Sequence, residues 1–450
     1  MIVASQNFIR EKGDKSSVSL REIRRFTIFF EFFFKYLKEK KETNFELLEN
    51  LREKQKENYT FYSKLNFKDI QIYSIILSVF VCYYLRISKN DIRETLKEKL
   101  SIILSEYDKN YENFLEVPKR EQKFIAMNIE LERGIATNRA LLDNIFALFV
   151  TINTKVPIFI VGKPGCSKSL SVQLMIKSMK GSSSNNFVFK NLPRITPVSY
   201  QGSMGSTSKG VKNVFKKARE LLKNSNNEDR EKIISMIYFD EMGLAEHSPN
   251  NPLKVIHSEL EYDLNEGNKK VAFVGISIWA LDASKMNRGL FLSITDPDEK
   301  DVKKTSRTIG KSYEIELDNN YKALYENIGL LYYQYKDYLN KNYKNGIEEV
   351  HGNRDFYHFV KNISNNIVEK KLRSLDNNIK NAIVIEGMER NFAGLILGNT
   401  RETSLKRMKR FYRRYEQNVE IEDKYEVLSK ISENIEDINS RYLLIISNHQ

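Results

Sequence analysis

The stretch VPIFIVGKPGCSKSL, Val156–Leu170, decides the fold of this chain. Its apolar run Pro157–Val161 predicts a buried strand, a glycine-rich turn follows, and a helical pattern begins at Lys168. A strand, the loop GKPGCSKS and a helix nearly match the phosphate-binding pattern G-x-x-x-x-G-K-[ST], in which Ser167 here replaces the last glycine. The stretch therefore predicts a nucleotide-phosphate loop, or, without a chemical role, only a tight connection between strand and helix.

A second chemical element is the apolar run IISMIYFDE, Ile233–Glu241, which predicts a strand that ends in two carboxylates. This is the Walker B pattern, in which Asp240 would hold a water of the Mg²⁺ shell while the hydroxyl of Ser169 ligates the metal. Glu241 would activate the attacking water as a general base. The alternative is a strand edge that merely ends in acidic residues. Because loop and acidic strand follow in the right order within one α/β unit, we favour nucleotide binding with Mg²⁺.

The phosphates of the nucleotide would be held by the loop itself. Lys168 would reach the β- and γ-phosphates of ATP. Backbone N–H groups between Pro164 and Ser169 would cradle them, together with the N-terminus of the following helix.

Two residues further along the chain are candidates for catalysis. The run Val271–Ser277 predicts a third strand, and Ser277 at its tip would lie beside the γ-phosphate or, alternatively, cap the following turn. Arg288 stands just before the apolar strand Leu290–Ile294. There it would act as a finger that neutralises charge on the nucleotide of a neighbouring subunit. The alternative for Arg288 is an ordinary surface arginine.

Composition narrows the classes of function. The 450 residues predict two to four domains, and the hydrophobic content of 41% is enough for large cores. Two cysteines, Cys82 and Cys166, exclude a disulfide framework, and the five histidines show no metal-ligand spacing, which favours a reducing, cytoplasmic setting. No signal peptide is indicated, because Arg10, Glu11 and Lys12 interrupt the first apolar residues.

The net charge suggests nucleic acid as a further partner, and one apolar stretch suggests a membrane. The net charge is +13, but the basic residues are dispersed among 59 acidic ones, and clusters such as Lys406–Arg414 look like solvated helix faces. A nucleic-acid motor is therefore only a remote alternative. The apolar stretch Ile70–Leu85 is shorter than the roughly 20 residues of a membrane span, and Lys68, Asp69 and Arg86 bound it closely. It predicts a buried helix and not a transmembrane segment.

The phosphate loop, acidic strand, polar strand tip and pre-strand arginine together are similar to those of an AAA+ ATPase. More closely, the chain resembles the mysterin family of giant RING-type E3 ubiquitin ligases, whose dynein-like core has six AAA+ units on one chain. The similarity runs from about Glu130 to about Leu397 and looks like the third unit. The segments that carry it are GIATNRALLDN, VGKPGCSKSL, DEMGLAEHSPNNPLK, FVGIS and WALD followed by KMNRGLF, DPDE, GNRDFYHFVK and ERNFAG.

The resemblance implies roles for single residues. It makes Ser167 a variant that the family tolerates, and it adds Arg354 as a lid arginine that senses the γ-phosphate. One departure is Ile278, since the family tends to read Ser-Asn-Trp where Ser277-Ile278-Trp279 stands, and without that water-orienting asparagine we expect slow hydrolysis. The residues expected at the nucleotide are Gly162, Lys163, Pro164, Gly165, Cys166, Ser167, Lys168, Ser169, Leu170 and Arg354.

The predicted fold class is α/β, an AAA+ P-loop NTPase with extensive flanking helices and a helical lid. The expected segments are upstream helices (1–120), a nucleotide-binding domain (121–310), the lid (311–400) and a linker (401–450) whose apolar run Tyr442–Ile446 would open a following unit. We expect hydrolysis of Mg-ATP to drive conformational change within a mysterin-like ligase. Neighbouring AAA+ units and ubiquitin-pathway proteins are the expected partners. The alternative is a nucleotide-binding scaffold unit that hydrolyses poorly.

Overall fold

The computed structural model describes residues 1–12, 18–43, 53–223, 232–265, 270–313, 319–343, 346–370, 377–397, 402–416, 431–432 and 435. Its contacts divide the chain into two units, one of residues 1–131 with 139–296 and one of residues 132–138 with 297–450. The run Tyr442–Ile446 lies outside the described residues. The assignment of four functional segments remains a prediction.

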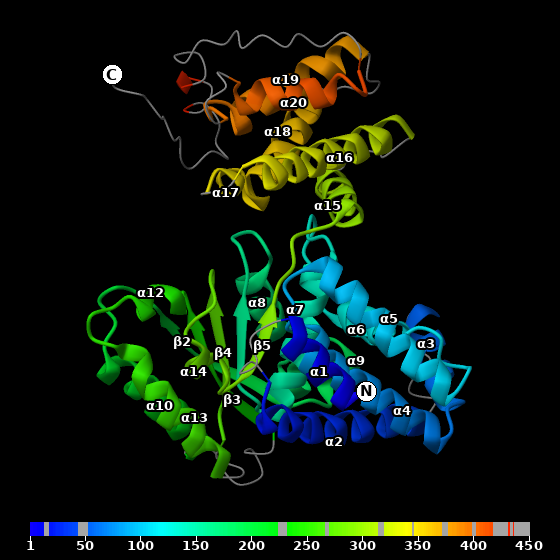
Figure 1. Ribbon diagram of the computed structural model, residues 1–450, viewed down its shortest axis with the longest axis vertical. Coiled ribbons are helices and arrows are strands. Elements are labelled where there is room, and N and C mark those ends of the chain that lie inside the picture. Colours follow the sequence, from blue (N-terminus) through cyan, green and yellow to red (C-terminus); the bar gives the residue numbers. More distant parts are fainter. Residues whose placement is uncertain are drawn as a thin grey trace. The chain divides into compact units, whose positions relative to one another are not determined.

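The first unit is built around a five-stranded parallel sheet with the strand order β2-β3-β4-β1-β5 (Figure 1). Together with the helices between the strands, this sheet confirms the predicted α/β fold class. The strands are β1 (Ile158–Val161), β2 (Arg194–Gln201), β3 (Ile233–Asp240), β4 (Ala272–Ser277) and β5 (Leu290–Ser293). Helix α7 (Arg139–Thr154) precedes β1, and the helices between the strands are α8 (Lys168–Ser178), η4 (Gly181–Ser183), α9 (Phe187–Lys190), α10 (Ser208–Lys223), α12 (Met242–Glu246), η5 (Pro252–Val255), α13 (Ile256–Asn265) and α14 (Ala283–Met286).

Both faces of the interior strand β1 are buried, as the continuous apolar run in its sequence predicts. Successive strand residues point to opposite faces. Phe159 and Val161 pack in one core with Phe215 of α10, while α7 contacts β1, β3, β4 and β5. The sheet is therefore covered by helices on both sides, and its functional groups concentrate where the strands end.

The helices upstream of the sheet belong to the same unit. They are α1 (Ile2–Lys12), α2 (Leu20–Glu42), α3 (Glu53–Ser63), α4 (Phe67–Val79), the π-helical turn η3 (Phe80–Tyr84), α5 (Asn90–Tyr107) and α6 (Glu116–Asn128). Arg93 of α5 fastens them to the sheet. Its guanidinium, 1% exposed, donates to Asp143 Oδ2 (2.9 Å), to the carbonyl of Ser293 at the end of β5 (2.9 Å) and to the carbonyl of Ile87 (2.8 Å). A buried charge with this many partners holds one arrangement of these elements.

The apolar stretch Ile70–Leu85 forms the helix α4 and the turn η3. By length and composition alone, Phe67–Tyr84 is the one described helix that is long and apolar enough to cross a membrane, but 67% of this window is buried inside the protein. The hydroxyls of its buried serines form hydrogen bonds within the helix: Ser74 and Ser78 each donate at 2.7 Å to the carbonyl four residues earlier. The burial agrees with the core helix expected from the sequence.

The second unit is helical and has its own hydrophobic core. Its helices are α15 (Glu299–Ser312), α16 (Asn319–Asn342), α17 (Ile347–Val350), α18 (Asn353–Glu369), α19 (Asn377–Phe392) and α20 (Ser404–Tyr412). Helices α15 and α16 approach closely at Gly310, where a Cβ atom would lie 2.3 Å from the ring of Tyr325. This contact requires glycine, so α15 is fixed against the core of the second unit.

Candidate nucleotide-binding site

The phosphate loop spans the gap between Val161, where β1 ends, and Lys168, where α8 begins. Gly165 (φ 80°) and Ser167 (φ 58°) both lie in the left-handed region. For a residue with a side chain this conformation costs roughly 1–2 kcal/mol, which explains why the usual pattern has glycine at the position of Ser167. Left-handed residues between right-handed ones turn successive N–H groups toward one concave side, a backbone shape that binds anions.

Lys168 is 8% exposed, and its Nζ donates to the carbonyls of Gly162 and Lys163, the latter at 3.0 Å. The ammonium is thus held at the inside of the loop. Pro164 has no N–H, so of the backbone donors expected between Pro164 and Ser169 the proline itself supplies none. Its fixed φ instead restricts the start of the turn.

Sequence reasoning missed Asn144 of α7, a fully buried residue that touches the loop. Its Nδ2 donates to the carbonyl of Cys166 at 3.1 Å. Because the carbonyl and the next N–H point in opposite directions across a trans peptide, this bond aims the N–H of Ser167 away from α7. The available signal was a polar residue on the apolar face of the helix, three positions after Leu141 and four before Leu148.

The two candidate metal ligands lie together at the carboxyl end of the sheet. Ser169 Oγ, in the first turn of α8, donates to Asp240 Oδ2 at 3.2 Å, although the two residues are 71 positions apart. Asp240 is the last residue of β3, and its other oxygen accepts the N–H of Glu241 at 2.9 Å. Tyr238 donates to Asp240 Oδ2 at 2.5 Å, and burial together with this bond raises the pKa of Tyr238.

This donor set fits Mg²⁺, which takes one or two protein oxygens and completes its octahedron with phosphate oxygens and water. A hydroxyl and one carboxylate supply the protein part. Among the described residues there is no group of three or more His, Cys, Asp and Glu that could hold a metal alone. The site therefore suits a metal that arrives with a phosphate ligand.

Glu241 follows β3 in a left-handed conformation (φ 52°) and precedes α12. The chain around it is crowded: a Cβ at Gly202 would lie 2.3 Å from the carbonyl oxygen of Glu241, and one at Gly243 would lie 2.8 Å from Ser277 Oγ. Left-handed residues other than glycine persist where surrounding packing over-determines them, and they cluster at functional sites. The tips of β2, β3 and β4 thus form one tightly packed edge around Glu241.

Ser277 lies directly beside the phosphate loop, because β4 pairs with β1 in the register Val161↔Ser277 and the N–H of Gly162 donates to its carbonyl at 3.3 Å. The side chain is 3% exposed, and its Oγ has no hydrogen-bond partner in the described part of the chain. Ser277 therefore does not cap the turn after β4. Ile278, the next residue, is half-buried.

Two predicted site residues lie apart from this edge. Arg288 precedes β5, which runs parallel to β1 with Ile158 opposite Leu290, so Arg288 lies at the amino end of the sheet and forms an ion pair with Glu261. It cannot serve the phosphate loop of its own chain. Arg354 is exposed in the first turn of α18, in the second unit. The roles of both remain predictions.

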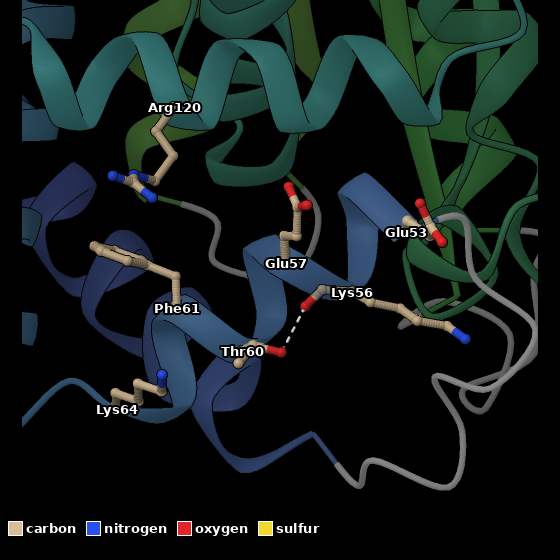
Figure 2. A pocket seen from close by; sticks show the side chains of 7 residues that line it. All are labelled: Glu53, Lys56, Glu57, Thr60, Phe61, Lys64 and Arg120. Atoms are coloured by element: carbon tan, nitrogen blue, oxygen red, sulfur yellow. Dashed lines mark hydrogen bonds between the residues drawn. The ribbon is translucent and has the colours of Figure 1, made fainter.

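Surface hollows occur elsewhere in the first unit. The hollow in Figure 2, of about 610 Å³, lies between α3 and α6 and combines acidic and basic side chains, with the Arg120 guanidinium 3.6 Å from the centre of the Phe61 ring. A second one, of about 370 Å³, lies between α10 and α13. Neither is lined by a residue of the phosphate loop.

With the geometry in place, comparison with known proteins identifies the family. Residues 134–301 match the RNF213 AAA domain. The chain is an AAA+ region of the RNF213, or mysterin, family. It is 33% identical over 69% of its length to human E3 ubiquitin-protein ligase RNF213, 29% over 99% to zebrafish rnf213-beta and 30% over 88% to mouse RNF213. The chain spans 6–8% of the length of these relatives. The family resemblance is confirmed, and the match to the third unit remains a prediction.

Proposed function

We propose that the first unit binds Mg-ATP at the carboxyl edge of its sheet. The observation that supports this most is the contact between Ser169 and Asp240, because it joins the phosphate loop to the acidic strand as a metal–phosphate site requires. Lys168 would neutralise the β- and γ-phosphates, and the loop N–H groups would bind their oxygens. Nucleotide binding is also what an AAA domain implies.

We further propose that the bound ATP is hydrolysed. Glu241 would take a proton from the attacking water, and Ser277, with its unpartnered hydroxyl, would orient that water or the γ-phosphate. Mg²⁺, when bound by Ser169 and Asp240, would supply positive charge to the β- and γ-phosphate oxygens. Arg288 would act on the nucleotide of a neighbouring AAA+ unit, since its own loop lies at the other edge of the sheet.

The test is a titration of fluorescent ATP with Mg²⁺ against Lys168→Ala. We expect affinity to fall by about two orders of magnitude, because the variant loses a charge-assisted contact to two phosphates. Lys212→Ala, which removes an exposed lysine of α10, is the matched control and should bind as the parent does. Unchanged affinity in Lys168→Ala would refute the proposal.

A second candidate function is a scaffold unit whose bound ATP is structural. Ile278 favours it, because an aliphatic side chain at the tip of β4 cannot orient water. Steady-state turnover of this chain alone and with a neighbouring AAA+ unit separates the two functions. Turnover that the neighbour stimulates supports the motor, whereas binding without turnover in both cases supports the scaffold.

The wider context is also proposed and not observed. The relatives are named E3 ubiquitin-protein ligases, and we propose that this unit moves its second unit in response to nucleotide within such a ligase, in contact with neighbouring AAA+ units and ubiquitin-pathway proteins. With two cysteines, this sequence holds no RING zinc cluster, so ligase chemistry would be supplied by other parts of the assembly. The two buried cysteines, neither of which forms a disulfide, support a cytoplasmic setting.

A further inference from the structure

The chain passes between its two units at three points. It leaves the first unit at 131/132, returns at 138/139, and leaves again at 296/297. Arg139 is the first residue after the return, and Asp296 is the last residue before the final exit. Contacts that fix Arg139 and Asp296 therefore determine where the chain can bend between the units.

Arg139 holds both of these crossing points in the first unit. Its Nη2 donates to the carbonyl of Asp296 at 3.2 Å, to Thr295 Oγ1 at 3.0 Å and to Asn90 Oδ1 at 2.9 Å. The amide of Asn90 completes the cluster, since its Nδ2 donates to the same carbonyl of Asp296 at 3.3 Å. Thr295 is 5% exposed. We call Arg139, Asn90, Thr295 and Asp296 the hinge clasp.

The hinge clasp is joined to the phosphate loop along the chain that follows β5. The N–H of Ile294 donates to the carbonyl of Val161 at 2.9 Å, and a Cβ at Gly162 would lie 2.9 Å from Cβ of Ile294. Lys163 pairs with the carboxylate of Asp296 at 3.2 Å. A shift of the loop backbone is therefore passed directly to residues 294–296.

A second route runs through α7, the helix that Arg139 begins. Five residues after Arg139, Asn144 bonds the carbonyl of Cys166 in the loop. Because a helix moves as a rigid element over one to two turns, a change at Cys166 reaches Arg139 through the same helix. Loop and clasp are thus connected twice.

On the other side of the crossing, the preceding segment is held by the second unit. Lys304 of α15 donates to the carbonyl of Thr137 at 2.5 Å, and Asn138 donates to Thr305 Oγ1 at 3.4 Å. The bond between Asn138 and Arg139 therefore joins two residues that are each fixed in a different unit. Motion between the units has to concentrate at the three crossings, 131/132, 138/139 and 296/297.

We propose that Arg139 is the positioning residue of this hinge: it keeps the crossings at 138/139 and 296/297 together beside the phosphate loop, so that nucleotide in the loop moves two of the three connections to the second unit at once. The proposal rests on the proposed nucleotide function. Arginine suits the task because the planar guanidinium holds the two hydrogens of Nη2 in fixed directions, whereas the hydrogens of a lysine ammonium rotate freely.

The experiment measures the distance between spin labels at Lys212→Cys and Lys361→Cys, exposed positions in the first and second unit. The native Cys82 and Cys166 are buried, and buried thiols are expected to react slowly with the label. Addition of Mg²⁺ with a non-hydrolysable ATP analogue should shift the distance distribution in the parent. In Arg139→Ala the analogue should bind within about threefold of the parental Kd, while at least half of the shift is lost. Arg139→Lys should fall between the two.

Arg24→Ala, which removes an exposed arginine of α2, is the control and should keep the full shift. A full shift in Arg139→Ala, or a parent that binds the analogue without any shift, overturns the hinge clasp while nucleotide binding stands. A parent that does not bind the analogue refutes the proposed function, and the clasp falls with it. If Arg139→Ala does not fold, Arg139→Lys decides: an undiminished shift overturns the proposal, and a reduced shift at parental affinity supports it.

Discussion

Two polar clusters of the first unit are built in opposite ways. In the upstream helices, Lys40 and Glu121 form an ion pair at 3.0 Å, and the hydroxyls of Tyr36 and Tyr62 both donate to the same carboxylate. At the candidate nucleotide site, by contrast, Ser277 Oγ has no hydrogen-bond partner in the described chain, and Ser167 is left-handed. The first cluster satisfies its own groups, whereas the second keeps strain and unused polar atoms.

This difference separates polar groups that hold the fold from those that can serve a ligand. Burial lowers the pKa of Lys40 to about 8 against the opposing effect of Glu121, and the ring of Phe124 covers the ammonium at 3.6 Å. No ligand is needed to complete such a cluster. The buried hydroxyl of Ser277 without a partner and the left-handed Ser167 both carry a folding cost, and both lie where the strand ends meet the phosphate loop.

The largest effect is expected on ATP turnover at the candidate nucleotide site. Glu241→Gln should bind Mg-ATP as the parent does but turn it over about 10²–10⁴-fold more slowly, because the amide cannot accept the proton of water. Glu220→Gln on the exposed face of α10 is the matched control. Binding by fluorescence titration and phosphate release by steady-state assay separate the two properties. Equal turnover in Glu241→Gln and the parent would remove Glu241 from the mechanism.

For the cluster around Lys40 and Glu121 we expect the reverse pattern, a loss of folding stability without a change in nucleotide affinity. Lys40→Met leaves Glu121 buried and without its cation, which should lower the free energy of unfolding by about 3–5 kcal/mol. Lys38→Met, on the same helix but 59% exposed, should change it by less than about 1 kcal/mol. Denaturant unfolding measures both. Equal stability of the two variants, or a loss of nucleotide affinity in folded Lys40→Met, would break the comparison.

The sequence alone predicted which residues come together at the candidate nucleotide site. It did not predict the cluster around Lys40 and Glu121. The loop, Asp240, Glu241 and Ser277 stand at strand ends, and parallel strands bring such ends to one edge. Lys40 and Glu121 are 81 positions apart on two helices, so only tertiary packing reveals that their charges meet. Arg93 is hidden in the same way, because three of its acceptors are backbone carbonyls, which any sequence supplies.

Asn144 shares a feature with each cluster, because it is fully buried and its side chain also bonds the phosphate loop. Asn144→Ala leaves the carbonyl of Cys166 without this donor, a loss of about 1–2 kcal/mol that should appear as a roughly tenfold weaker affinity for Mg-ATP. Asn153→Ala is the control, because the amide of Asn153 on the same helix donates to the local carbonyl of Phe149, and the bonds described for Asn153 do not involve the phosphate loop. If both variants bind Mg-ATP equally well, Asn144 is structural and belongs with Lys40.

The smallest effect concerns the strain itself. Ser167→Gly should stabilise the first unit by about 0.5–1 kcal/mol, because relief of the left-handed conformation outweighs the greater backbone entropy of glycine. Gln173→Gly, at an exposed position of the right-handed helix α8, has no such strain to relieve and should be destabilised by about 0.5–1 kcal/mol. Thermal unfolding without nucleotide gives both values. A gain in Ser167→Gly with unchanged affinity for Mg-ATP means that the loop needs the backbone shape and not the serine side chain. A loss of stability in Ser167→Gly would instead show that the serine hydroxyl stabilises the loop by more than its left-handed conformation costs.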